Sequence, residues 1–173
     1  MGCSLLPLDP KPDQRGWLLE VFRTSWLPDI PCSQINLMWS LAGTLRGSHV
    51  HGVHVDCFVM ASGECLIGLK DVRDRSPTFG LVSLLQLSCA VPNLMVVPAG
   101  VVHGLYFPVD SILLTVESDF YDPGEEILCR WDDKELGIPW PFTTPILSDK
   151  DAQAQSYREM MAIIKPWQTN FTI

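Results

Sequence analysis

Four histidines are the residues of this chain that most directly offer chemistry. His49, His51 and His54 lie within six residues of one another, and His103 follows later in the chain. If the first segment is a strand, His49 and His51 point to the same face, because side chains two residues apart share a face. A histidine near neutral pH serves as a general base or as a metal ligand. We therefore predict one site built around this pair, with His54 in a loop outside it.

Short apolar segments separated by turn signals indicate the elements that hold these histidines. Residues 57–61 and 64–70, with Ser62 and Gly63 between them, predict a β-hairpin. Further strands are predicted at residues 79–87, 94–97, 103–107 and 112–116. Regular short strands with turns between them are typical of an all-β sandwich or barrel.

The helical pattern is confined to the C-terminal part of the chain. Ser148 offers an N-cap before acidic first-turn residues, residues 152–164 hold good helix formers, and Pro166 ends the pattern. Residues 131–145 are rich in proline and tryptophan and are expected to form an ordered loop packed on the strands. We predict an all-β fold with a short C-terminal helix, in one domain spanning residues 1–173.

Composition limits the function. The chain has 173 residues, of which 47% are hydrophobic, so it can bury a core. Its 12 basic and 20 acidic residues give a net charge of −8, which disfavours nucleic-acid binding. Six scattered cysteines without a C-x-x-C pair are expected to be free thiols. There is no membrane-spanning or signal-peptide pattern, so we expect a cytoplasmic protein that does not bind membranes.

The spacing of the histidines resembles the two signature motifs of the cupin superfamily, whose members are jelly-roll barrels (double-stranded β-helices). Residues 43–63 fit G-x5-H-x-H-x(3,4)-E-x6-G with Asp56 at the acidic position, and residues 98–103 fit P-x-G-x2-H. In metal-binding cupins these positions hold one divalent ion. The resemblance therefore implies a candidate metal site for Fe, Mn, Ni or Zn, made of His49, His51, Asp56 and His103.

A longer series of motifs resembles the dTDP-4-dehydrorhamnose 3,5-epimerase family. Residues 13–22 look like D-x-R-G-x-F-x-E-x-F, and residues 43–49 look like G-x-L-R-G-x-H. The series continues, in order, with Q-x-N, D-x-R-x-x-S-P-T-F-G, P-x-G-x-A-H-G-F, W-x-D-x-x-L-G-I-x-W-P and L-S-x-K-D at residues 34–36, 71–80, 98–105, 131–141 and 147–151. Because the blocks run in order along nearly the whole chain, it is identified as a member of this family.

The resemblance implies an isomerase that acts on a dTDP-4-keto-6-deoxyhexose. A base removes a proton from C3 or C5, alpha to the C4 carbonyl, and an acid returns one to the other face. By position the base is His49, and Asp151 is the carboxylate that orients it. No cofactor is favoured by the resemblance, although a divalent metal remains an alternative.

The resemblance also implies how the nucleotide sugar is bound. Arginines would grip the diphosphate through guanidinium forks, and an aromatic side chain would stack on the base. Arg15 and Glu20 belong to the segment that, in the family, reaches the neighbouring subunit, which implies a homodimer. The substrate-binding residues carried over are Arg15, Glu20, Gln34, Asn36, Arg46, His103 and Tyr121.

Three positions depart from the family pattern. Asp56 stands where the family has a lysine that steadies the enolate oxygen, and His51 stands where it has a glutamine. Thr115 stands where it has the proton-donating tyrosine, with Tyr106 as the alternative phenol. We favour an epimerase with altered acid chemistry, because the motifs cover nearly the whole chain. A metal-dependent enzyme on the same scaffold, with the ion as Lewis acid, and a non-catalytic sugar-nucleotide binding module stay open.

Overall fold

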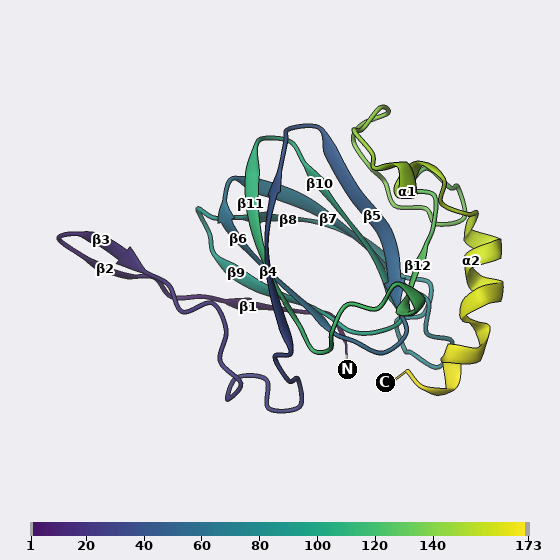
Figure 1. Ribbon diagram of the computed structural model, residues 1–173, viewed down its shortest axis with the longest axis horizontal. Helices are drawn as coiled ribbons and strands as arrows, with labels where there is room; N and C mark the ends of the chain where they lie inside the picture. The colour runs from purple at the N-terminus through teal and green to yellow at the C-terminus, as the bar shows by residue number, and fades with distance from the viewer. Residues whose placement is uncertain (1, 172–173) are drawn as a thin grey trace.

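Two five-stranded antiparallel sheets form the body of the computed structural model, which describes residues 2–171 (Figure 1). The strands of one sheet, in spatial order, are β1 (Ser4–Pro7), β9 (Asn93–Val97), β6 (Asp56–Ser62), β11 (Ser111–Glu117) and β4 (Gln34–Ser40). Those of the other are β12 (Glu126–Leu128), β5 (Thr44–His51), β10 (Val101–Phe107), β7 (Glu64–Asp71) and β8 (Val82–Ser88). This arrangement confirms the predicted all-β architecture.

The core lies between the two sheets, where inward-facing residues of both meet. The alternation along β10 is clear, because His103, Leu105 and Phe107 face the interior while Tyr106 lies on the other face, stacked on Phe142. Apolar side chains fill one part of the interior, and these include Phe58, Ile67, Met95, Leu105, Phe107 and Leu113. The histidines and acidic residues occupy the remaining part and form its polar end.

The predicted hairpin at residues 57–70 is wrong in its pairing, although both strands exist. β6 pairs with β9 and β11, whereas β7 pairs with β10 and β8, so the chain crosses from one sheet to the other at Gly63. Gly63 has φ +72°, and a Cβ there would lie 2.3 Å from Ser111 Oγ. Ser111 fills this corner and bonds both backbone groups of Glu64. The turn signal was therefore correct, but it marks a sheet-to-sheet corner.

The C-terminal helical segment also differs from the prediction. In place of one helix over residues 152–164, there are α1 (Asp149–Ala152) and α2 (Tyr157–Ile164), followed by the 3-10 helix η2 (Lys165–Thr169). The break arises because Ser156 begins a new helix with a capping box to Glu159. Helix α2 ends before Pro166, as expected, and its buried Met160 and Ile164 pack against the outside of the second sheet.

Two peripheral parts complete the fold. β2 (Lys11–Asp13) and β3 (Gly16–Leu18) form a small hairpin that projects away from the sheets (Figure 1). The 3-10 helix η1 (Pro123–Glu125) leads into β12. Residues 131–145 form the predicted ordered loop, which packs through the buried side chains of Leu136 and Ile138. No helix in the described part of the chain is long and apolar enough to cross a membrane.

Candidate active site

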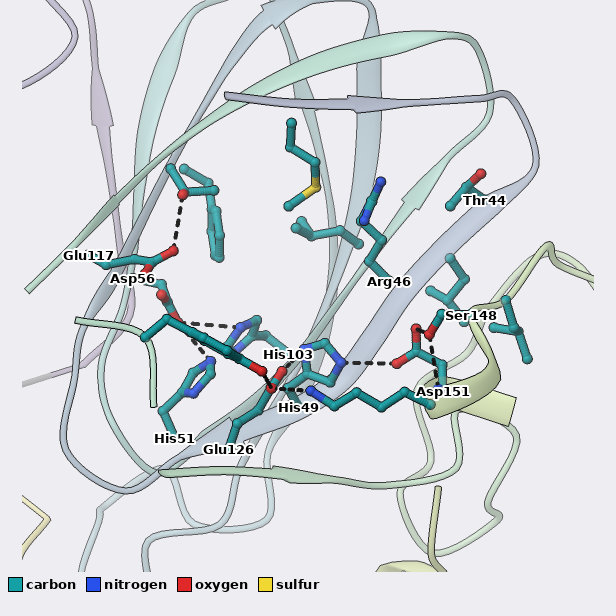
Figure 2. A pocket seen from close by; sticks show the side chains of 18 of the residues that line it. Thr44, Arg46, His49, His51, Asp56, His103, Glu117, Glu126, Ser148 and Asp151 are labelled. Carbon is teal, nitrogen blue, oxygen red and sulfur yellow. Dashed lines mark hydrogen bonds and ion pairs between the residues drawn. The ribbon is translucent and has the colours of Figure 1, made fainter. Parts of the chain in front are cut away.

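A cavity of about 430 Å³ lies at the polar end of the interior, between the two sheets (Figure 2). One wall comes from β5, β10 and β12, the opposite wall from β6 and β11, and the rim from the segment that leads into α1. Its charged and titratable lining consists of Arg46, His49, His51, His54, Asp56, His103, Glu117, Tyr121, Glu126, Lys150 and Asp151. All four histidines of the chain therefore meet in one cavity.

The structure brings His49 and Asp151 together, as the sequence predicts. His49 lies on β5, and its Nε2 is 3.0 Å from Asp151 Oδ1. Asp151 belongs to the first turn of α1, where Ser148 Oγ donates to its Oδ2 at 2.7 Å and accepts from its backbone N–H at 3.1 Å. This N-cap fixes the carboxylate at the cavity rim, so that it orients the imidazole.

A second carboxylate holds the other side of the same ring. Glu126 lies opposite His51 in the β12–β5 pairing, and its Oε1 reaches the diagonal neighbour His49 at 2.9 Å from Nδ1. Burial disfavours the charged ring, but hydrogen bonds to Asp151 and Glu126 outweigh it and raise the pKa of His49 to about 9. Glu126 is itself held by Lys150, which forms an ion pair with its Oε2. His49 is thus an imidazolium at neutral pH while this contact persists.

A close approach of two strands sets the positions of His49 and His103. The two residues are cross-strand partners on β5 and β10, next to a register shift in the β10–β5 ladder. Gly47 has φ +99°, and a Cβ there would lie only 2.8 Å from the carbonyl oxygen of His103. Glycine is therefore required at this point of β5, because any side chain would push the two strands apart.

Three further cavity residues form a second cluster, made of His51, Asp56 and His103. All three are buried, and Asp56 Oδ2 lies 3.3 Å from His51 Nε2 and 3.4 Å from His103 Nε2 (Figure 2). Burial lowers the pKa of His51 to about 3 and also lowers that of His103. The arrangement separates His49 from the four-residue metal set implied by the cupin resemblance, because both of its ring nitrogens face carboxylates.

The prediction for His54 is wrong in one respect. It does lie in the loop between β5 and β6, but its side chain is buried in the cavity. The ring is 3.9 Å from that of His51, and its Nε2 is 3.5 Å from Asp56 Oδ1. A loop residue reaches the interior here because the loop is short and both flanking strands point their polar residues inward.

The opposite wall carries Thr115 at the position of the family's tyrosine, and Glu117 beside it. These residues are two apart on β11 and therefore share a face, and Thr115 Oγ1 donates to Glu117 Oε1 at 3.2 Å. Asn36 donates to the same oxygen at 2.7 Å. Burial and the nearby Asp56 raise the pKa of Glu117. Tyr106 faces away from the cavity on β10 and is not among its lining residues within the described chain.

The predicted substrate-binding residues fall into two groups. Arg46, His103 and Tyr121 line the cavity, and Gln34 accepts a hydrogen bond from the backbone of Tyr121. Asn36 contacts the lining residues Thr115 and Glu117. The other group, Arg15 and Glu20, lies outside this cavity; Arg15 is in the turn of the projecting β2–β3 hairpin, where it pairs with Asp13. Their role toward a neighbouring subunit stays a prediction.

Sequence reasoning missed three charged residues of the site. Glu126, Lys150 and Glu117 line the cavity, yet none belongs to the histidine motifs that predict the site. Lys150 stands inside the L-S-x-K-D block, next to Asp151, and that position was a usable signal. Glu126 depends on the pairing of β12 with β5, which no local pattern predicts. Glu117 follows Thr115 by two residues, so strand periodicity could have indicated it.

Known proteins match both the sequence and the fold. A relative from Shigella flexneri, named dTDP-4-dehydrorhamnose 3,5-epimerase, is 31% identical over 168 residues, which are 89% of this chain and 91% of the relative. A relative of the same name from Neisseria gonorrhoeae is 31% identical over 85% of this chain, which spans only 47% of that longer protein. The structure of a 3'-monoepimerase from Streptomyces bikiniensis in complex with dTDP-quinovose superposes with a TM-score of 0.84 at 27% identity, covering 95% of this chain and 86% of that one.

The family assignment rests on the length of these matches. The sequence model of the dTDP-4-dehydrorhamnose 3,5-epimerase family matches residues 1–159, which carry both sheets and the cavity. The solved relative shares the same jelly-roll fold over nearly the full chain. This chain therefore belongs to the dTDP-4-dehydrorhamnose 3,5-epimerase family.

Proposed function

We propose that the protein is an isomerase that epimerises a dTDP-4-keto-6-deoxyhexose at a carbon next to the C4 carbonyl. The observation that carries this proposal is the pair of His49 and Asp151 at the rim of the cavity, in a chain of this family. A carboxylate-oriented histidine is the standard device for moving a proton from carbon at neutral pH. The two relatives are named dTDP-4-dehydrorhamnose 3,5-epimerases, and the solved structure is of a 3'-monoepimerase with dTDP-quinovose bound, which supports the assignment.

The reaction needs a free ring nitrogen on His49. Asp151 holds Nε2, and Glu126 occupies Nδ1. In our proposal the bound sugar takes the place of Glu126 at Nδ1, while Lys150 keeps Glu126 through its other oxygen. Loss of that one carboxylate contact also removes a main cause of the raised pKa, so the imidazolium releases its Nδ1 proton to solvent as the sugar binds and becomes a neutral ring with a free lone pair. His49 Nδ1 then accepts the proton from C3 or C5 and leaves an enolate.

The proton that returns to the other face must come from the opposite wall. Thr115 is a much weaker acid than the phenol that the family has at this position. Glu117 stands beside it and lines the same cavity, across from His49 in Figure 2. We assign the return of the proton to this side of the cavity, with Glu117 as the carboxyl group that it offers.

Two cations are available for the diphosphate. Arg46 lies on β5 at the rim, where Ser40 Oγ accepts from its Nε at 2.9 Å and the carbonyl of Trp39 accepts from its Nη2 at 3.2 Å. Lys150 lies on the same rim and is 5.9 Å from the ring of Tyr121. In a protein of net charge −8, these inward cations supply the attraction that a dianionic group requires.

The test is solvent exchange. The protein is incubated with dTDP-4-keto-6-deoxyglucose in deuterated water, and deuterium at C3 and at C5 is followed by NMR. We expect incorporation at one or both carbons, and a loss of about 10²–10⁴-fold in rate for His49→Asn, the range for a general base. Tyr106→Phe is the matched control, because Tyr106 stacks on Phe142 outside the cavity. Absence of exchange at both carbons in the unaltered protein would contradict the proposed substrate.

We also propose that the protein works as a homodimer. β4 is an edge strand, and its outward face carries the exposed apolar residues Ile35, Leu37 and Trp39. The projecting β2–β3 hairpin exposes Trp17 and Leu18. An exposed apolar edge strand is stabilised in solution when another surface buries it, and a second copy of the same chain can provide that surface. Light scattering on Trp39→Glu, compared with the unaltered protein, tests this, since a monomer in both samples would contradict it.

We also propose that the protein works in the cytoplasm. All six cysteines are free in the structure, and Cys57, Cys65 and Cys129 are buried. Burial raises the pKa of Cys65 and Cys129 to about 12, so these thiols are inert apolar fillers. Free thiols of this kind support our placement of the protein in the reducing cytoplasm.

A further inference from the structure

The cavity holds a buried carboxylate that lacks a partner of good geometry. Asp56 is 4% exposed, and its Oδ2 makes no hydrogen bond within residues 2–171. The Nδ1 atom of His51 is also buried without a hydrogen-bond partner there. A buried ionised oxygen left in this state is costly unless another group joins it. These unpaired atoms indicate that a component of the site is missing from the protein's own side chains.

The orientation of His103 places a second hydrogen-bond acceptor opposite Asp56. Its Nδ1 is 3.2 Å from the carbonyl oxygen of Val101, which only accepts hydrogen bonds, so Nδ1 is the nitrogen that carries the proton. In the neutral ring, Nε2 then presents a lone pair to Asp56 Oδ2, 3.4 Å away. Two acceptors face each other in the interior, and a cation between them removes the repulsion. A histidine that donates Nδ1–H to a backbone carbonyl is also the usual way in which proteins orient an imidazole toward a metal.

We propose that His51, Asp56 and His103 bind one divalent transition-metal ion. Each of these residues offers one ligand atom, and the three atoms all lie within 4.8 Å of one another. Two of the spacings are 3.3 and 3.4 Å. Ligands at ~2.0–2.1 Å from a tetrahedral ion are separated by about 3.3–3.4 Å, so these atoms already have the required spacing. Two imidazoles and one carboxylate suit Zn²⁺, Fe²⁺, Mn²⁺, Co²⁺ or Ni²⁺, and they leave positions open for water or a substrate oxygen.

The neighbouring histidines have other tasks. His49 uses both ring nitrogens on Asp151 and Glu126, so it is not a ligand in this arrangement. His54 lies against the other oxygen of Asp56, at 3.5 Å from Oδ1, and its ring packs on His51. It therefore supports the ligands from behind. The proposed centre is a three-residue site and differs from the four-residue set that the cupin resemblance implies.

The position of the ion gives it a role in the proposed reaction, and this part of the inference rests on that reaction. Asp56 occupies the place where the family has a lysine. A divalent ion on Asp56 restores positive charge at that point, beside the His49 base, where an enolate oxygen develops negative charge. The ion would polarise the C4 carbonyl when an open coordination position accepts its oxygen. In this chain a bound metal ion would therefore replace the charge of the family's lysine, with Asp56 and His51 as two of its ligands.

The first experiment measures metal alone and needs no sugar substrate. The purified protein is stripped with a chelator, dialysed, and titrated with Zn²⁺ and, separately, with Co²⁺. We expect one equivalent of each, with the Co²⁺ visible spectrum of a site that has nitrogen and oxygen ligands. His51→Gln and Asp56→Asn should each weaken binding by more than about 100-fold, because removal of residues that merely support ligands already costs 10–100-fold. Circular dichroism and thermal melting verify that each variant is folded.

Matched variants separate the possible outcomes. His49→Asn removes a histidine of the same cavity outside the triad, and Glu117→Gln removes a carboxylate of the same cavity; both should keep one equivalent. No binding in the unaltered protein would overturn the proposal and would leave a proton as the occupant between Asp56 and His103. Binding that survives in both His51→Gln and Asp56→Asn would also overturn it, since the ion would then sit elsewhere.

The solvent-exchange assay is run last, on stripped and reloaded protein. Faster exchange after reloading would support the role of the ion next to the enolate. Stoichiometric binding with no exchange in either sample would leave the metal site intact and contradict the proposed substrate instead. The failure of one proposal is therefore distinguishable from the failure of the other.

Discussion

Asp71 and Asp56 are two buried aspartates of this barrel, and they differ in the hydrogen bonds that their carboxylates accept. They are 6% and 4% exposed, respectively. Asp71 accepts five hydrogen bonds, from the backbone N–H, Nε and Nη2 of Arg73 and from the hydroxyls of Ser76 and Thr78, at 2.6–3.0 Å. Asp56 Oδ2 accepts none within the described chain and faces only imidazole nitrogens at 3.3 and 3.4 Å.

The difference shows what each carboxylate is for. Asp71 and its partners come from one short stretch, residues 71–78, so the local sequence supplies a complete set of donors. Such a fully satisfied cluster stabilises the corner between β7 and β8 and has no capacity left for a ligand. Asp56 gathers His51 and His103 from different strands and leaves its lone pairs available. An incomplete set of partners in the interior is the mark of a binding site.

The largest effect should come from neutralising each aspartate in metal-free protein. Asp71→Asn breaks the buried ion pair with the Arg73 guanidinium, whose side chain is 3% exposed, and should lower the free energy of unfolding by about 3–5 kcal/mol, the range for breaking such a pair. Asp56→Asn changes a carboxylate whose Oδ2 accepts no hydrogen bond within residues 2–171, and it should cost clearly less. Urea denaturation of both variants in the presence of chelator measures this. Equal losses would mean that the two sites do not differ as described.

Metal should narrow the difference between the two variants. At a free Zn²⁺ concentration of about 100 times the dissociation constant, binding to the native state adds about 2.7 kcal/mol to the free energy of unfolding. We expect this gain in the unaltered protein and in Asp71→Asn, but not in Asp56→Asn. Thermal melting with and without Zn²⁺ provides the measurement, with Mg²⁺ as the control ion. A gain that Asp56→Asn retains would place the ion away from Asp56.

A milder change sharpens the picture of the satisfied cluster. Arg73→Lys keeps the positive charge but loses the fork that gives Asp71 two side-chain hydrogen bonds. The loss of one or two charge-assisted bonds should lower the free energy of unfolding by about 1–2 kcal/mol. Urea denaturation at neutral pH is the assay. A loss as large as that of Asp71→Asn would show that geometry, and not charge, dominates the cluster.

The smallest effect is expected from mild acid. Burial opposes ionisation of Asp71, but its hydrogen bonds to Arg73, Ser76 and Thr78 prevail and lower its pKa from 3.8 to about 2. Because the native pKa is the lower one, this carboxylate stabilises the fold above pH 4, and its contribution is lost as the pH falls toward 2. Between about pH 4 and pH 3 the unaltered protein should lose stability that Asp71→Asn does not lose. Parallel slopes in that range would contradict the assignment.

Local patterns in the sequence predicted the strands well, and their pairing less well. Periodicity located β6 and β7 because it reflects burial on each strand. The hairpin between them was wrong because Gly63 looks the same in a hairpin as at a corner between sheets. The packing of Ser111 on that glycine is what distinguishes the corner from a hairpin, and it involves a residue far away in the sequence. The split of the C-terminal helix could have been predicted, since Ser156 and Glu159 have the spacing of a capping box.

The site was predictable where chemistry is carried by short motifs. His49, His103 and Asp151 belong to three such blocks, and the structure brings all three into the cavity. Glu126 was missed because it reaches His49 through strand pairing. The sequence also could not predict that His49 and His51 belong to two different clusters. Strand periodicity shows that they share a face, but it does not show which side chains each of them contacts. That division depends on Glu126 and Asp151 holding one ring while Asp56 faces the other.

The Ser148 cap of α1 has a consequence for how the protein becomes competent. The strands of both sheets end at residue 128, whereas Asp151 lies in the C-terminal segment that packs on those sheets. A chain cut within residues 131–145 would keep both sheets and the three-residue cluster, yet lose the carboxylate that orients His49. Such a cut chain would still bind the metal but would no longer transfer the proton. Limited proteolysis within residues 131–145, followed by assays of both properties, would show this separation.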